Sequence, residues 1–562
     1  LAHAAQHADI IGLMMLGRTL PDGHRHEVRW EADRLDTTVA YIREHAGART
    51  VELNALVQMV QVTDDRVALF TAPTVSRDTV IRLRATLRTT QGRVATDEAL
   101  VLVERHLQAT GSTALWTDQH VQRVHAYKPA SRYAADLVRC TYDTRQNDAS
   151  GLAPLCTLSQ LPFLAQNAIG GLPTVEQVMD RVVVSHDWLG RNFETFLRTQ
   201  DTRGDFRRML GSVTAVVLGT QVRPSFYYAG TGAIYLDADT FWMTPEERDT
   251  INEAPDYRSE FGSELKFVDL WRYVKDNQSI LAYFDARQRI TRSVDDVRNE
   301  TAWVMYHELG HALDFLPPAD YNGLNPRWTA WSNLYGRYSQ MALTSDTVSA
   351  TYPLTSVAML DLAQVKFHGA KATAEQRSFT PDDVASFFMT DLATDSYSYS
   401  ATHEDVAMTL EEFLMAHRLG VRRDVAFGNP YAGGSITVRW GQRGRIGEPA
   451  LHPRTRAIVQ ALVPWLDVNE VDRLPEPLAM RVGQSWYDDL SLPAIPRLAK
   501  PLSAAEQVAQ AWRAQRDVAR MQKRAHWSGP RLPAPPVALG IAVSRRCGGA
   551  AAARWPGRCP AE

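Results

Sequence analysis

The sequence predicts a multidomain protein in which an N-terminal all-β domain precedes a larger α+β domain. Two observations indicate this fold class. Short alternating runs of apolar and polar residues fill residues 21–107, whereas residues 161–500 mix strand-like apolar runs with longer helical segments. The chain has 562 residues, which is too long for one ordinary domain. Residues 1–20, 108–160 and 501–562 then form an incomplete N-terminal segment, a connector, and a C-terminal helix with a disordered tail.

The composition is that of a globular protein, with 45% apolar and 22% charged residues. A net charge of −3 provides no basic surface for nucleic acid or an anionic membrane. No apolar run approaches the ~20 residues of a membrane span. The run from Ile10 to Leu16 is short and lacks a basic flank, so it does not resemble a signal peptide. We expect no nucleic-acid partner, no transmembrane segment in this chain, and a true N-terminus upstream of Leu1.

Residues 21–107 have the period-two alternation of an antiparallel β-sandwich, with turns such as Pro21-Asp22-Gly23 between the runs. The runs are Glu27–Trp30, Val51–Leu53, Arg66–Phe70, Val80–Leu87 and Ala99–Val103. The segment Phe70-Thr71-Ala72-Pro73, followed by the Val80 run and by Val94-Ala95-Thr96-Asp97, resembles Ig-like repeats of the polycystic-kidney-disease type. That resemblance implies an Ig-like spacer or adhesive module outside the cytoplasm.

The connector at residues 108–160 contains Cys140 and Cys156. The stretch between them, Thr141 to Leu155, is rich in Asp, Asn, Gly and Ser and is typical of a loop. We predict a local disulfide, which would imply an oxidising compartment. The alternative is two unrelated thiols.

In the α+β domain, Val175–Leu197 is predicted to be helical, with a break near Gly190. Val213–Leu218 and Gly232–Leu236 are predicted to be buried strands, and Thr244-Pro245 begins a helix. We assign Gly232–Leu236 as an edge strand that pairs with an extended substrate. The alternative is an ordinary structural strand.

The remaining segments are predicted in chain order, on either side of a helix at Val294–Phe315. They are a helix at Pro326–Tyr338, an irregular stretch at Leu343–Ser400, a helix at Glu404–His417, a hairpin at Ile436–Ile446, helices at His452–Leu462 and Ala504–Arg524, and a disordered tail from Pro530.

The helix at Val294–Phe315 contains His307-Glu308-Leu309-Gly310-His311, an H-E-x-x-H motif. Side chains at positions i and i+4 of a helix share a face, so both imidazoles can bind one Zn²⁺ ion. Glu308 can then take a proton from the water that the ion activates. The alternative is a helix with two surface histidines. The apolar flanks predict a buried helix, whose polar side chains need partners.

Two histidines leave a tetrahedral zinc site one protein ligand short. Asp314 and Pro317 occupy the positions that a third histidine pattern in the same helix would need as Gly and His. We predict Glu404 as the third ligand because it begins a downstream helix, and Ala407 permits a close approach of the two helices. Glu411 and Glu412 are the fallback ligands. The alternative role for Glu404 is a charge favoured by the helix dipole.

His307, Glu308 and His311, completed by Glu404-Asp405-x-Ala407, resemble the gluzincins, zinc metallopeptidases in which a glutamate on a second helix completes H-E-x-x-H. The resemblance implies a zincin-like metallopeptidase domain at residues 161–500. The sequence departs from many relatives at Met408, where they carry an acid.

The same resemblance implies an oxyanion donor, since in some gluzincins a tyrosine seven residues before the ligand glutamate stabilises the developing charge. Tyr397 has that spacing and Tyr399 is the alternate. Exposed loop tyrosines are the alternative interpretation. Asp405 or Asp314 could orient a zinc-binding imidazole.

His403 and His417 are predicted to be structural or to face the substrate rather than to bind the metal.

The sequence therefore predicts a zinc metalloendopeptidase that acts on protein or peptide substrates. Two other functions are open: a surface-binding or adhesive protein with an inert zinc domain, and an amidase for cell-wall peptide. The Ig-like resemblance and the cysteine pair favour a bacterial protein that is secreted, periplasmic or on the cell surface. Sequence alone assigns neither a cleavage specificity nor an oligomeric state.

Overall fold

The computed structural model describes most of the chain between residues 120 and 492, and only the backbone of short strands before that. The described residues are 3–5, 10–14, 26–33, 67–71, 76–77, 79–89, 94–103, 107–108, 120–143, 155–251, 258, 260–281, 289–431, 435–488 and 490–492.

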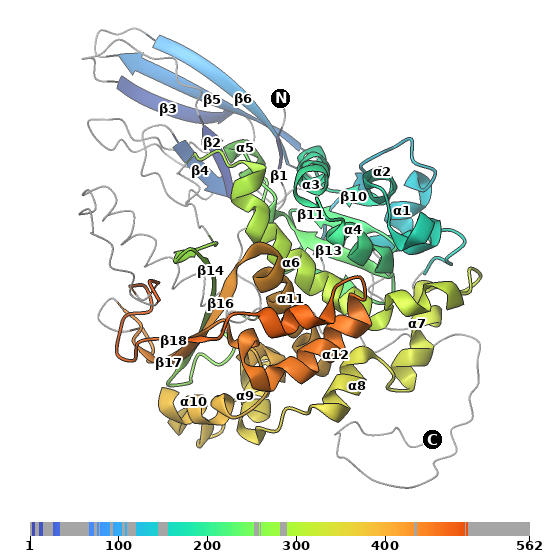
Figure 1. Ribbon diagram of the computed structural model, residues 1–562. Helices are drawn as coiled ribbons and strands as arrows, with labels where there is room; N and C mark the ends of the chain where they lie inside the picture. The colour runs from blue at the N-terminus through green and yellow to red at the C-terminus, as the bar shows by residue number, and fades with distance from the viewer. Residues whose placement is uncertain are drawn as a thin grey trace, which may run out of the picture.

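The N-terminal strands form two small sheets, drawn in blue (Figure 1). The first has the order β1 (His3–Ala5), β6 (Val94–Val103), β5 (Thr79–Thr89), β3 (His26–Asp33), and the second pairs β2 (Ile10–Met14) with β4 (Val67–Thr71). Strands therefore lie at four of the five predicted runs, and Val51–Leu53 lies outside the described residues. These pairings do not establish a sandwich, so the Ig-like module stays a prediction.

Beyond residue 120 the chain has mixed α+β content, as predicted, and is organised around two five-stranded sheets. The first sheet has the order β12 (Phe226–Tyr228), β13 (Ala233–Asp237), β11 (Val216–Gly219), β10 (Val182–Val184), β9 (His125–Ala126). Its three central strands run parallel, and β12 and β9 are antiparallel edges. Strand β9 comes from the segment predicted as a connector, which thus contributes to this sheet.

The first sheet is buried on both faces, which explains its continuous apolar runs. Alternate residues of one strand lie in different cores, as the period of two requires. Val216 and Leu218 lie in the core that also contains residues of the motif helix, whereas Val217 lies in a core with residues of α1 (Ala134–Thr141).

The predicted helix at Val175–Leu197 is wrong in where it breaks. The structure has α2 (Val175–Met179), then strand β10, then α3 (Asp187–Gln200). Gly190 lies inside α3, where an added Cβ would come within 2.3 Å of the Tyr127 ring. This glycine permits close packing and does not end a helix.

The assignment of Gly232–Leu236 as the edge strand is also wrong. Strand β13 pairs with β11 on one side and with β12 on the other, so it is interior. The antiparallel edge is β12, which was not predicted because its three residues are too short for a periodicity to show.

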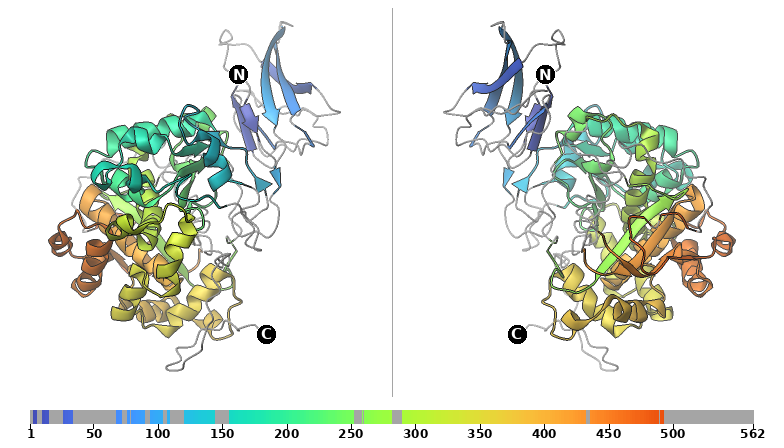
Figure 2. Two further views of the ribbon diagram at one scale, coloured as in Figure 1. Left: turned by 90° about the vertical axis from the view of Figure 1, so that its right-hand side faces the viewer. Right: turned by 90° about the vertical axis from the view of Figure 1, so that its left-hand side faces the viewer.

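The second sheet is antiparallel throughout and has the order β15 (Gln278–Ser279), β14 (Val268–Lys275), β16 (Arg422–Gly428), β17 (Val438–Arg443), β18 (Leu478–Ala479). Strands β14 in green and β16 in orange lie side by side (Figure 2). The predicted hairpin at Ile436–Ile446 is wrong, because β17 pairs with the preceding strand β16 and Arg445–Gly447 forms a 3-10 turn.

The second sheet differs from the first in carrying buried charges on both faces. On one face Asp424 accepts from Arg272 of β14 and from Arg443 of β17, at 2.8 and 2.6 Å. The next register pair, Arg423 with Tyr273, lies on the opposite face, because successive side chains alternate.

The longest helices are α6 (Val294–Phe315) and α11 (Thr402–Leu419), which pack against each other (Figure 1). Helix α6 also contacts β12 and β13 of the first sheet, and its Trp303 ring lies 5.1 Å from Trp271 of the second sheet. The helix pair therefore has a sheet on either side.

The stretch Leu343–Ser400 is not irregular as predicted, since it contains α8 (Thr344–Thr351), α9 (Val357–His368) and α10 (Pro381–Met389). Its Ser, Thr and Asp residues act as helix caps. Thr380 and Asp383, for example, form the capping box of α10. The helix predicted at His452–Leu462 is confirmed as α12, and the helix predicted at Pro326–Tyr338 is α7, which begins later, at Ala330, and ends at Ser339.

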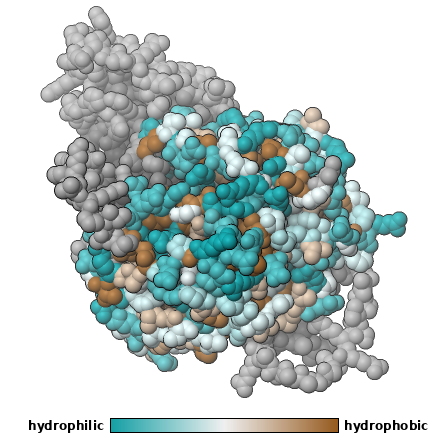
Figure 3. Space-filling model, viewed as in Figure 1, coloured by the Kyte–Doolittle hydropathy of each residue, from teal (hydrophilic) through white to brown (hydrophobic). Residues whose placement is uncertain are grey.

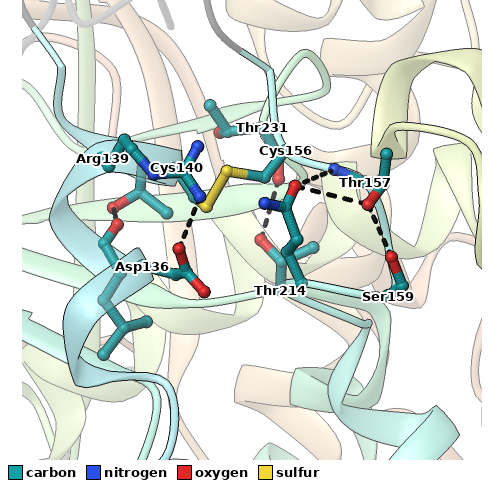
Figure 4. Close-up of a disulfide and its surroundings, with 11 residues drawn as sticks. Asp136, Arg139, Cys140, Cys156, Thr157, Ser159, Thr214 and Thr231 are labelled. Atoms are coloured by element: carbon teal, nitrogen blue, oxygen red, sulfur yellow. Dashed lines mark hydrogen bonds and ion pairs between the residues drawn. A yellow bond between two sulfur atoms is a disulfide. The ribbon is translucent and has the colours of Figure 1, made fainter.

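The predicted disulfide is present between Cys140 and Cys156 (Figure 4). Cys140 lies near the end of α1, and the residue after Cys156, Thr157, bridges to Thr329 before α7. The disulfide thus connects α1 to the segment that pairs with the residues just before α7.

On the face seen in Figure 3, hydrophobic residues are scattered among hydrophilic ones. In the part of the chain that the structure describes, no helix has the length and apolar character to cross a membrane. The predicted helix at Ala504–Arg524 and the tail from Pro530 lie outside the described residues.

Candidate metal centre

Helix α6 begins and ends as predicted, at Val294 and Phe315. Ser293 caps it, and Asp296 completes a capping box. Seventeen of its 22 residues are buried, so the motif lies in the protein core. Polar side chains in a helix that is this deeply buried need hydrogen-bond or ionic partners.

Helix α11 supplies the second half of the site and ends at Gly420, which has a φ of 64°. The two helices approach each other closely at Gly310 and Ala407. A Cβ added at Gly310 would lie 3.2 Å from the Ala407 Cα. Small residues on both helices therefore bring the ligand side chains together, as the sequence predicted for Ala407.

The structure brings together His307, His311 and Glu404, whose ligand atoms could hold one metal ion. The Nε2 atoms of the two histidines are 3.2 Å apart, and each lies 3.2 Å from Oε2 of Glu404. Ligand atoms in a tetrahedral zinc site are about 3.3 Å apart, given bonds of about 2.0–2.2 Å. The edges of the triangle are therefore close to the spacing of ligand atoms around one tetrahedral metal ion.

The two carboxylates of the site have few partners in the protein. Oε2 of Glu404 faces the two histidine Nε2 atoms, and among the described residues Oε1 of Glu308 is buried and accepts no hydrogen bond. A buried carboxylate oxygen without a partner is costly. A cation beside Glu404 and a water molecule beside Glu308 would satisfy both, so these residues fit a metal with a reacting water.

The electrostatics also favour a cation at this position. Burial lowers the pKa of His307, but the neighbouring carboxylates of Glu404 and Glu411 outweigh burial and raise it to about 10. Burial would raise the pKa of Glu404, but His311 and His307 hold it well below its ordinary range. The site is thus built to keep positive charge, as a proton or as a metal ion, next to ionised carboxylates.

Glu308 has a pKa suited to proton transfer near neutral pH. Burial raises the pKa of its carboxyl to about 7, against the opposing charges of His307 and His311. A general base works best when its pKa lies near the operating pH.

Glu411 orients His307 and is not positioned as a ligand. Its Oε2 accepts a hydrogen bond from Nδ1 of His307 at 2.8 Å, which leaves Nε2 facing Glu404. A carboxylate in this position fixes the tautomer and the ring orientation of a metal-binding histidine. The signal was present in the sequence, because Glu411 lies seven residues after Glu404 and therefore on the same helix face.

The two residues predicted for that orienting role, Asp405 and Asp314, contact neighbouring helices. Asp405 is bound by Arg454, whose Nη1 donates to Oδ1 at 3.2 Å. Asp314 accepts from the backbone N–H of Ser345 at 2.8 Å. Both aspartates therefore hold neighbouring helices in place.

Of the two candidate tyrosines, Tyr397 lies next to the site. Its ring centroid is 6.3 Å from that of His307, with the planes 29° apart. Tyr399 instead donates its hydroxyl proton to Asp391 at 3.1 Å. Both are buried, in contrast to exposed loop tyrosines.

The other residues considered from the sequence lie outside the group of three ligands. His403 has Nε2 3.8 Å from Oε1 of Glu404, and its ring centroid is 5.6 Å from that of His311. His417 stacks on Phe413, more than three helical turns after Glu404 on α11. Glu412 is buried near Arg423, with 3.6 Å between its Oε1 and Nε of the arginine, and does not join the ligand group.

A scan against protein-family models, a search of curated proteins and a search of solved structures found no match for this chain. The interpretation of the site therefore rests on its own geometry.

Proposed function

We propose that this protein is a zinc-dependent metallopeptidase of the gluzincin type. The observation that carries the proposal is the buried triangle of His307, His311 and Glu404 with 3.2 Å edges, beside the buried and unpartnered Oε1 of Glu308. Two imidazoles and one carboxylate are a ligand set of catalytic zinc sites that leave a position open for water.

The three ligands would hold the ion, and Glu411 would keep the His307 tautomer that presents Nε2. When bound, zinc supplies a Lewis acid that acidifies water and polarises a carbonyl group. Glu308 takes the proton of the attacking water and returns it to the leaving amine. Tyr397 donates a hydrogen bond to the oxygen on which negative charge develops.

The substrates that we propose are proteins or peptides, as for other zinc metallopeptidases of this type. Strand β12 is the antiparallel outer strand of the first sheet and contacts helix α6, but its three residues are buried, so its edge is not presented to a substrate in this structure.

We further propose an extracytoplasmic location, with the strands before residue 108 forming an Ig-like module. The disulfide between Cys140 and Cys156 supports this, because such bonds persist in oxidising compartments.

The test is the variant Glu308→Gln, assayed for zinc content and for cleavage of a broad peptide library. Turnover should fall by about 10²–10⁴-fold while one zinc per chain is retained, because the amide cannot accept the proton. Glu300→Gln is the matched control, since Glu300 is buried on the same helix two turns earlier and lies near Arg292. Wild-type turnover in Glu308→Gln would contradict the mechanism.

A further inference from the structure

A chain of buried contacts joins the metal-ligand histidine to the turn that carries Tyr397. Arg423 of strand β16 lies at its centre. Its Nε and Nη2 donate to Oδ2 of Asp395 at 3.0 and 2.9 Å, and its Nη1 lies 3.4 Å from Oε1 of Glu411.

Each of the two carboxylates uses one oxygen for Arg423 and the other for the site. Glu411 accepts from His307 through Oε2. Asp395 accepts through Oδ1 from the backbone N–H of Tyr397 at 2.8 Å, as the cap of the short 3-10 helix Ser396–Tyr399. Through these two carboxylates, the guanidinium group of Arg423 is therefore connected both to His307 and to the backbone of Tyr397.

The Tyr397 ring also packs near the His307 ring, so the two sets of contacts that start at Arg423 end at neighbouring side chains. Arg423 is itself fixed from two sides. Its guanidinium lies 4.3 Å from the centre of the Trp271 ring and 5.4 Å from that of Tyr273. The Tyr273 hydroxyl also donates to the same Oε1 of Glu411 at 2.5 Å. Arg423, Asp395 and Glu411 are all buried, so water cannot replace a lost contact cheaply.

We propose that Arg423 is a positioning residue that sets His307 and Tyr397 relative to one another, through Glu411 and Asp395. The inference rests on the proposed function and adds to it a residue more than one hundred positions from the motif. A lysine cannot replace the arginine here, because an ammonium group lacks the planar fork that contacts two carboxylates at once.

The test compares Arg423→Lys with Arg272→Lys. Arg272 is the matched control because it is buried on the adjacent strand and pairs with Asp424 at 2.8 Å on the opposite face of the same sheet. Three quantities are measured: zinc affinity by chelator competition, kcat and KM on a cleaved peptide, and the midpoint of thermal unfolding.

In Arg423→Lys we expect zinc affinity and kcat each to fall by up to about 10-fold with KM unchanged, because Arg423 acts through Glu411, whose own loss is at the low end for residues that orient metal ligands. Arg272→Lys should lower the thermal midpoint and leave zinc affinity and kcat unchanged. The proposal is overturned if folded Arg423→Lys keeps wild-type zinc affinity and kcat, or if Arg272→Lys loses as much.

A second variant covers the case in which Arg423→Lys does not fold. Asp395→Asn keeps an oxygen for the Tyr397 N–H but loses the charge that pairs with Arg423, so zinc affinity and kcat should fall at least about threefold. Wild-type values in folded Asp395→Asn would overturn the proposal. If the wild-type protein binds zinc but cleaves no peptide, the proposed function is wrong. The role of Arg423 is then still tested by the zinc affinities of the variants.

Discussion

The two sheets that flank the helix pair hold it in different ways. The first sheet contributes apolar side chains to the core shared with α6, from strands such as Val216–Gly219 and Ala233–Asp237. The second sheet contributes Arg423 and Tyr273, which contact Glu411 of α11. Apolar packing is non-directional, whereas charged hydrogen bonds fix orientation. We therefore expect the first sheet to determine stability and the second to determine the geometry of the site.

The largest effect is expected in the first sheet, from Leu218→Ala. Leu218 is fully buried between Val184 and Leu236, so truncation leaves a cavity and should lower the free energy of unfolding by about 2–5 kcal/mol. Urea denaturation measures the loss, and chelator competition should show unchanged zinc affinity in the folded protein. A large fall in zinc affinity would mean that the sheets do not divide these roles.

A smaller effect, on zinc affinity and not on stability, is expected from Glu411→Gln. Glu411 belongs to α11 and contacts the second sheet through Arg423 and Tyr273. The amide can still accept from His307 but carries no charge, so zinc affinity should fall about 10-fold, at the low end for such partners. Glu247→Gln is the control, because Glu247 is a buried glutamate that accepts from Asn192 away from the site. Equal zinc affinities in the two variants would remove the orienting role of Glu411.

The last effect is small near pH 5 and grows as the pH rises, and it concerns Glu412, beside Arg423. Burial, together with the charges of Asp395 and Glu411, raises the pKa of Glu412 to about 8, although Arg423 opposes this shift. The folded protein then keeps a proton that the unfolded chain releases above its ordinary pKa of 4.5. Stability should therefore fall by up to about 1.4 kcal/mol per pH unit as the pH rises toward 8, and this loss should level off above 8.

Glu412→Gln mimics the protonated carboxyl and removes that dependence. The difference in free energy of unfolding, variant minus wild type, should rise between pH 5 and about 8 and then stay constant. A difference that does not change with pH would show that Glu412 is ionised in the folded protein throughout this range, and that the second sheet tolerates its charge.

Much of the candidate site could be predicted from local spacing. His307, Glu308 and His311 share one helix, and the bounds of α6 follow from Ser293 at its start and from Pro317 after its end. Strands whose position depends on the strand that they pair with were harder to predict. Strand β12 has three residues, and its place at the edge is decided by the strand that it joins. The helices between Leu343 and Ser400 were missed because their caps share the composition of loops.

The sequence by itself determined that His307 and His311 share one helix face, because helix geometry places i and i+4 together whatever the rest of the chain does. It also indicated Glu404, which the fold brings to within 3.2 Å of both histidines. Only the tertiary structure decided that Glu411 orients His307, that Tyr397 and not Tyr399 lies beside it, and that Arg423 joins both. These contacts connect α6, α11 and β16, and no periodicity within one segment encodes a distance between side chains of separate elements.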